Sequence, residues 1–199
     1  VFIFPIQWIP ENPRWQNYVD IWHKIPLSKF VLNTVKLTLI VTFLQLLTSS
    51  FAAYAFAKLQ FKGKNTLFLA YITTIAVPWQ VYMVPQFMMM RSFGLADTHL
   101  AIICLQAFSA FGVFMMKQFY EGIPTELCEA ARIDGMTEYQ IWYRVMLPLS
   151  KPALSTLTIF TFVNTWNDFL GPLIYLTTES KKTLQLGLRM FIRQFGSEY

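Results

Sequence analysis

The sequence predicts an all-α protein, a polytopic bundle of transmembrane helices. Of its 199 residues, 55% are hydrophobic and only 14% are charged, whereas an average soluble domain carries roughly a quarter charged residues. Four stretches contain no more than one charged side chain each and reach the length of about 20 residues that a helix needs to cross a bilayer. Too few polar residues remain to coat four such helices in water, so the pattern excludes a soluble helical protein.

These stretches are the predicted spans, residues 31–57, 65–90, 98–116 and 152–176. Lys36 and Asp168 are their only charged residues. The second span would be about 39 Å long at ~1.5 Å per residue, so we expect it to tilt, emerge or kink. Pro78 and Pro85 are the expected places for a kink.

The short connecting segments predict an orientation, because lysine and arginine in short loops favour the cytoplasmic side. The hairpin 58–64 holds three lysines and is predicted to be cytoplasmic, which by alternation places the long segment 117–151 there as well. We expect the other connections outside, with the Trp- and Pro-rich part of 10–30 at the membrane interface and residues 1–9 as the exit of an earlier span. These outer connections are residues 1–30, 91–97 and 177–199.

Several chemical functions are excluded by what the sequence lacks. The net charge is +5, but no run of Lys and Arg exceeds two residues, so no basic face for nucleic acid is predicted. Cys104, Cys128, His23 and His99 are too scattered for a metal site or a disulfide framework. GxSxG, HExxH and phosphate-binding Gly-rich motifs are also absent. We therefore predict that the chain is not an enzyme and binds no cofactor of its own.

The segment 123–150, IPTELCEAARIDGMTEYQIWYRVMLPLS, predicts two short helices joined at a glycine corner. Pro124 suits the first turn of the first helix, and Glu126 and Glu129 favour its N-terminal end. Gly135 can adopt the left-handed conformation that ends many helices. Spacing places three apolar side chains on one face, namely Leu127, Ala130 and Ala131.

The second helix of this segment has its own start and stop signals. Thr137 is a candidate N-cap, and Gln140 would complete a capping box. Pro148 is expected to stop the helix. Its apolar face consists of Ile141, Trp142 and Val145.

The same residues resemble the EAA signature of ABC importer permeases. Glu129-Ala130-Ala131 is followed by Gly135 and then, after nine intervening residues, by Val145-Met146-Leu147-Pro148, with Val145 where family members usually have Ile. Further stretches are similar to the carbohydrate-uptake branch with its MalG-type permeases. They are PENPRWQNYVDIW at 10–22, AAYAF at 52–56, FKGK at 61–64 and WNDFLGP at 166–172. Members of that branch have six spans, so the resemblance implies a partial permease domain that lacks most of the first span and all of the last.

The resemblance also implies a mechanism and a set of partners. An extracellular or periplasmic solute-binding protein would deliver a sugar to this permease and a second, MalF-like permease in the bacterial or archaeal plasma membrane. Two cytoplasmic ABC ATPases, which hold the ATP and Mg²⁺, would supply the work. The EAA helix would dock in a cleft of an ATPase. The implied coupling residues are Glu129, Ala130, Ala131 and Gly135, with Leu127, Asp134 and Pro148 in support.

The residues that line a solute path remain open at this stage. Asp168 could line the path or cap a helix near the outer interface. Asn164 and Asn167 could face the path or bond between helices, whereas Gln45, Gln106 and the methionines at 83 and 88–90 are expected to pack. Two alternatives to sugar transport also stay open, namely a permease for another solute such as a polyamine or phosphate, and a membrane scaffold without transport.

Overall fold

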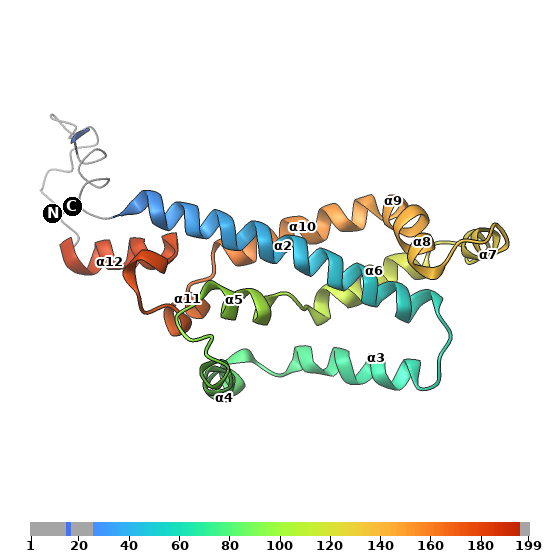
Figure 1. Cartoon of the computed structure of the whole chain (residues 1–199), viewed down its shortest axis with the longest axis horizontal. Coiled ribbons are helices and arrows are strands. Elements are labelled where there is room, and N and C mark those ends of the chain that lie inside the picture. The colour runs from blue at the N-terminus through green and yellow to red at the C-terminus, as the bar shows by residue number, and fades with distance from the viewer. Residues whose placement is uncertain (1–14, 17–25, 196–199) are drawn as a thin grey trace, which may run out of the picture.

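The computed structural model describes residues 15–16 and 26–195, and within these residues the chain is helical, without strands. The expectations for residues 1–9 and for most of 10–30 lie outside this described part. A long helix, α2 (Leu27–Lys58), runs the length of the bundle (Figure 1). The elements that follow α2 are α3 (Lys64–Thr73), η1 (Thr74–Ala76), α4 (Trp79–Ser92), α5 (His99–Gln106), α6 (Ala110–Glu121), α7 (Glu126–Ile133), α8 (Glu138–Ile141), the π-helical η2 (Trp142–Met146), α9 (Leu147–Leu149), α10 (Lys151–Trp166), α11 (Leu170–Tyr175), η3 (Glu179–Lys181) and α12 (Leu184–Phe195).

Helix α2 packs along α6 and α10, and its buried positions carry small and β-branched side chains as well as large ones. A close approach lies at Gly112 of α6. A Cβ atom there would lie 2.5 Å from Oγ of Ser49 and 3.4 Å from Cδ1 of Leu157. Small residues allow membrane helices to approach in this way, and dispersion contacts between them then hold the helices together.

The predicted span 65–90 is not one continuous helix. Its two halves, Lys64–Ala76 and Trp79–Ser92, are bent by 101° relative to each other, so that α4 crosses the bundle while α3 runs along it (Figure 1). Pro78 explains the break, because proline forces the preceding residue out of the helical region, and Val77 is extended. Pro85 lies within α4, where the helix continues.

Two other predicted spans are also interrupted. Residues 107–109 separate α5 from α6, and the free carbonyl of Ala107 accepts a hydrogen bond from Oγ1 of Thr48, 2.6 Å away. Helix α6 then continues to Glu121, past the predicted end at 116. The predicted span 152–176 divides at 167–169 into α10 and α11, since Pro172 cannot donate to the carbonyl of Asp168 as a continuous helix would require.

Two stretches of the described chain have the length and composition to cross a membrane, namely the continuous helix Leu27–Lys58 and His99–Glu121, which includes the break between α5 and α6. The number rises to four if each bent pair forms one span, and the second such pair is Glu138–Leu149 with Lys151–Trp166. The turn between α2 and α3 and the segment α7–α9 lie at one end of the bundle, whereas α11 and α12 lie toward the other (Figure 1). This arrangement agrees with the predicted alternation, and the assignment of the first end to the cytoplasm stays a prediction.

At the end opposite α7, polar contacts fasten the segment after α11. Oδ1 of Asp97 accepts hydrogen bonds from the backbone N–H groups of Thr177 and Thr178, 2.9 and 3.0 Å away. Lys181 adds an ion pair to Oδ2 of Asp97 at 2.9 Å. The hydrogen bonds from Thr178 and from Lys181 hold the pKa of the Asp97 carboxyl below its usual range. Asp97 makes these contacts from a left-handed backbone conformation, with φ of 56°.

Candidate functional site

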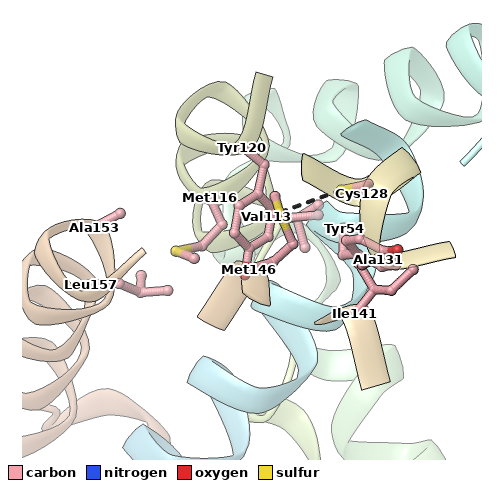
Figure 2. Packing of buried hydrophobic residues seen from close by; sticks show 11 residues of the cluster. Tyr54, Val113, Met116, Tyr120, Cys128, Ala131, Ile141, Met146, Ala153 and Leu157 are labelled. Atoms are coloured by element: carbon pink, nitrogen blue, oxygen red, sulfur yellow. Dashed lines mark hydrogen bonds between the residues drawn. The ribbon is translucent and has the colours of Figure 1, made fainter. Parts of the chain in front are cut away.

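The first candidate site is the segment α7–α9, which the EAA resemblance singled out. Helix α7 begins after Thr125, so Pro124 precedes the helix instead of occupying its first turn as expected. Glu126 and Glu129 do lie in the first turn. The buried face of α7 consists of Cys128 and Ala131, which are 0% and 5% exposed and pack in a core with Ile141 and Met146 (Figure 2).

The structure therefore divides the three side chains that were expected on one apolar face. Ala131 points into the core of the chain itself, whereas Ala130 and Leu127 are exposed. The reason is that Cys128, which spacing alone did not select, supplies the second inward position three residues before Ala131. Glu129 and Asp134 are exposed as well, so the outward surface of α7 combines acidic, small and apolar side chains.

The corner between α7 and α8 has the predicted form. Gly135 has φ +79°, its N–H donates to the carbonyl of Arg132 at 3.0 Å, and the N–H of Met136 donates to Ala131 at 3.0 Å. The capping box of Thr137 and Gln140 is present at the start of α8. Both signals were local, because a left-handed glycine and a capping box each depend on residues within one turn.

Pro148 does not stop the second helix. The chain continues through the π-helical turn η2 into α9, which contains Pro148, and bends by 81° after Leu149. In η2 the N–H of Leu147 bonds to the carbonyl of Trp142, five residues back. This wider turn accommodates the proline ring that would otherwise clash with the carbonyl four residues earlier.

A charged cluster joins α7, α8 and the end of α2. The Arg132 guanidinium donates from Nε to Oε1 of Glu138 at 2.7 Å across the glycine corner. Oε2 of Glu138 also accepts a hydrogen bond from the hydroxyl of Tyr54, a residue of α2 that is 2% exposed. The hydrogen bond from Arg132 lowers the pKa of the Glu138 carboxyl and raises the pKa of Arg132. One carboxylate thus connects three helices.

The outward side of this segment carries large apolar side chains that are mostly exposed. Ile133 is 87% exposed, and Tyr139 and Tyr143 are exposed by about two thirds, at 69% and 66%. Tyr139 stacks on Phe51 of α2. Several exposed, large apolar side chains in one segment are typical of a surface that contacts another molecule.

The second candidate site is a cavity of about 530 Å³ between α2, α4, α5, α6, α10 and α11. Its wall combines aromatic rings with amide and hydroxyl groups. The lining residues are Gln45, Trp79, Tyr82, Gln86, Ile102, Leu105, Gln106, Phe108, Ser109, Phe111, Leu157, Phe160, Thr161, Asn164, Thr165, Asp168, Gly171 and Tyr175. Apart from Asp168, the described lining is uncharged at neutral pH. Such a wall can stack on a ring and donate and accept hydrogen bonds.

The structure places Asp168 at the cavity and also at the start of a helix. It lines the cavity, and its Oδ2 accepts a hydrogen bond from Nε2 of Gln106 at 2.7 Å. Its Oδ1 accepts from the backbone N–H of Gly171 at 3.1 Å, which caps the start of α11. The carboxylate therefore holds the break between α10 and α11 in place while it faces the cavity.

The two asparagines are separated by the structure. Asn164 lines the cavity, whereas Asn167 lies outside the lining and accepts a hydrogen bond from Gln185 at 3.2 Å. Gln45 and Gln106, which were expected to pack, both line the cavity. Their signal was present in the sequence, since each is an amide within an otherwise apolar span, like Asn164.

The aromatic residues of the cavity wall could not be distinguished in the sequence from the many other aromatic residues of the chain. Trp79 and Tyr82 reach the cavity because the bend at Pro78 brings α4 across the bundle, and Nε1 of Trp79 donates to Oε1 of Gln86 at 2.7 Å. Within the described residues, no group of three or more His, Cys, Asp or Glu side chains could hold a metal ion. Cys104 and Cys128 are both free.

Comparison with known proteins identifies the type of chain. Residues 45–199 match the family model described as binding-protein-dependent transport system inner membrane component. The arabinooligosaccharides transport system permease protein AraQ of Halalkalibacterium halodurans is 38% identical over 167 residues, which are 84% of this chain and 60% of that protein. The lactose transport system permease protein LacG of Rhizobium radiobacter is 32% identical over 183 residues, 92% of this chain and 67% of that protein.

A solved structure agrees with these relatives. The crystal structure of a bacterial ABC transporter involved in the import of the acidic polysaccharide alginate contains a chain with a TM-score of 0.87 and 28% sequence identity. The match covers 96% of this chain and 67% of that chain. The chain spans about 60% of the length of the AraQ relatives. The family match extends over most of the chain, and the fold is that of an ABC importer permease, so the chain belongs to the family of binding-protein-dependent transport system inner membrane components.

Proposed function

We propose that the chain is part of a permease subunit of a binding-protein-dependent ABC importer and that it forms part of the membrane path for a sugar or oligosaccharide. The observation that carries the proposal is the family match over residues 45–199. The relatives named above are transport system permeases for arabinooligosaccharides and for lactose. The subunit would lie in the inner membrane as a multi-pass protein, where the long apolar helices can be buried in lipid.

The cavity supports a carbohydrate as the solute. Aromatic rings such as Trp79 and Tyr82 can pack on the apolar face of a sugar ring, and the amides of Gln45, Gln86 and Asn164 can bond its hydroxyl groups. The described lining offers no Lys or Arg to a phosphate, which favours an uncharged solute. A second permease subunit would close the open side of the cavity, and a solute-binding protein would deliver the sugar.

Uptake in membrane vesicles tests this assignment. The full-length permease, assembled with its ATPases and binding protein, should import a labelled neutral oligosaccharide when ATP is supplied. Replacing Trp79 by Ala should reduce import and leave assembly intact, whereas the same change at Phe61, an exposed residue of the α2–α3 turn, should have little effect. Import of glycerol phosphate or a polyamine in place of the sugar would contradict the proposed solute class.

The segment α7–α9 is proposed as the surface that docks on a cytoplasmic ATPase, with ATP and Mg²⁺ held by that partner. The outward residues Glu129, Ala130, Leu127 and Asp134 would contact the ATPase, since a small side chain such as Ala130 allows a helix to enter a groove. Ala131, Gly135 and Pro148 would act indirectly, by holding the shape of the segment.

A pair of substitutions separates these two roles. Ala130→Trp adds volume on the exposed side and should weaken co-purification of the ATPase without lowering the thermal stability of the permease. Ala131→Trp adds the same volume inside a closely packed core and should destabilise the segment itself. If Ala130→Trp retains the ATPase and imports at the parental rate, the docking surface lies elsewhere.

A further inference from the structure

One end of α2 is fastened to the proposed docking segment at two points. Tyr54 and Lys58 lie one turn apart on the same side of the helix and are 2% and 7% exposed. The hydroxyl of Tyr54 donates to Glu138, which the Arg132 ion pair joins to α7. Nζ of Lys58 donates to the carbonyl of Ile123 at 2.5 Å, just before α7 begins. Both the entrance of the segment and its corner are thus attached to α2.

The other end of α2 is fastened to the segment that precedes α12. Nδ2 of Asn33 donates to the carbonyls of Ser180 and Lys182 at 2.9 and 3.0 Å. Oγ1 of Thr34 accepts a hydrogen bond from the N–H of Leu184 at 2.8 Å. This outer segment is in turn held by Asp97 through Lys181.

Between these two attachments α2 is one continuous helix. Asn33 and Tyr54 lie about 32 Å apart at ~1.5 Å per residue. In the described part of the chain, the other three predicted spans are each interrupted, at residues 77–78, 107–109 and 167–169. The chain also leads directly from the docking segment into α10, but this connection is not a continuous helix, because the chain bends by 81° between α9 and α10. A continuous helix transmits a displacement over this length, whereas a break allows its two sides to move separately.

We propose that α2 is the element that transmits movement of the segment α7–α9 to residues 180–184 at the opposite end of the bundle, with Tyr54 and Lys58 as the positioning residues. This inference rests on the proposed docking of an ATPase. It assigns the coupling to two contacts of α2, neither of which touches the ATPase or the solute. The docking segment and α2 should accordingly move as one body when ATP binds.

Paired spin labels in the assembled, full-length importer test this directly. One label is placed at Arg144, an exposed residue of η2, and the second either at Leu39 on the exposed side of α2 or at Leu67 on α3. Cys104 is replaced by Ser, and Cys128 is left in its buried position. On ATP binding, the distance from Arg144 to Leu39 should stay constant while the distance from Arg144 to Leu67 changes.

The double variant Tyr54→Phe/Lys58→Met should separate the two bodies. The distance from Arg144 to Leu39 should then change on ATP binding, and the amount of sugar imported per ATP hydrolysed should fall at least about tenfold, because two hydrogen bonds that involve charged groups are lost. The single variant Lys58→Arg, with Tyr54 unchanged, keeps a donor at position 58 and should couple ATP hydrolysis to import as the parental importer does. The matched controls are Tyr71→Phe, which removes a hydroxyl from α3 at the edge of the same core, and Lys62→Met in the exposed turn.

The results that overturn the proposal are distinct from failure of the proposed function. If the parental importer couples ATP hydrolysis to uptake but its distance from Arg144 to Leu39 changes as much as that to Leu67, α2 does not move with the docking segment. An unchanged import ratio in the double variant would also overturn it. A parental importer that neither imports sugar nor retains the ATPase would contradict the proposed function, and this inference with it.

Discussion

Gly135 shows how one residue determines the shape of the proposed docking segment. Its φ of +79° is strained for any residue with a side chain, yet a Cβ there would contact nothing within 4 Å. The cost of Gly135→Val is therefore one of backbone conformation, which we expect to exceed ~1–2 kcal/mol because valine is β-branched. The measurements are sugar uptake and proteolysis of the segment. Gly135→Asn is the control and should retain most of both, since asparagine tolerates this conformation.

Glu138 gives the same segment a pH dependence. The pKa of its carboxyl is lowered in the folded chain by the hydrogen bond from Arg132. Its contribution to stability is therefore complete above the ordinary glutamate pKa of about 4.3 and is lost as the pH falls through the lowered value. Proteolysis of residues 122–150 in the solubilised protein should accelerate in that acidic range. In Glu138→Gln, which has no charge to lose, the rate should change much less, and an equal acceleration would contradict this role.

At the residue scale, the sequence predicted local geometry better than it predicted contacts. The conformation of Gly135 and the capping box of Thr137 follow from neighbours within one turn, and both were correct. The inward position of Ala131 depends on how α7 rests against α6 and α8, which no local pattern contains. The bond between Gln106 and Asp168 joins residues 62 positions apart, so the amide could be noticed but its partner could not.

Among the elements, the contact between α2 and α6 limits side-chain size at Gly112. A Cβ there would lie 2.5 Å from Oγ and 3.1 Å from Cβ of Ser49, so one of the two helices would have to shift. Gly112→Val should therefore push α6 away from α2 and cost about 1–3 kcal/mol. Thermal unfolding of the purified permease measures this loss. The same substitution at Gly122, where a Cβ would meet only a backbone oxygen at 3.4 Å, should cost clearly less.

The breaks within the predicted spans explain why composition located the helices but not their course. Uncharged stretches revealed where apolar helices lie. Pro78 and Pro85 were both predicted as places for a kink, yet the helix breaks at Pro78 and continues through Pro85. The two prolines differ in position: Pro85 falls inside α4, which continues through it, whereas Pro78 immediately precedes α4, where the missing N–H of proline is well tolerated.

At the scale of the whole molecule, both ends of the bundle can be assigned to a side of the membrane by labelling. Lys62 is an exposed residue of the turn between α2 and α3, and Ser180 is an exposed residue of η3, between α11 and α12. The α2–α3 turn lies at one end of the bundle, and α11 and α12 lie toward the other (Figure 1). In a Cys104→Ser background, Lys62→Cys should resist an impermeant thiol reagent in intact cells, and Ser180→Cys should react. Permeabilised cells provide the control in which both react. Reversed labelling would contradict the predicted orientation and the docking assignment that depends on it.

The cavity is the feature of the whole molecule that the sequence could least predict. Its wall draws on six helices, and its aromatic residues arrive with α4 after the bend at Pro78. The type of protein, in contrast, could be predicted, because the EAA spacing and the uncharged stretches are local properties of the chain. The family match over residues 45–199 confirms that prediction.

The burial of Cys128 supplies the chain with an internal reporter. The thiol is 0% exposed, with Sγ 3.7 Å from Sδ of Met146, and burial raises its pKa. A protonated and shielded thiol does not react with alkylating reagents, because the thiolate is the nucleophile. The rate at which Cys128 is alkylated in a Cys104→Ser protein therefore measures how often α7 lifts away from the core. The native residue can report the rate of this opening event without an introduced cysteine.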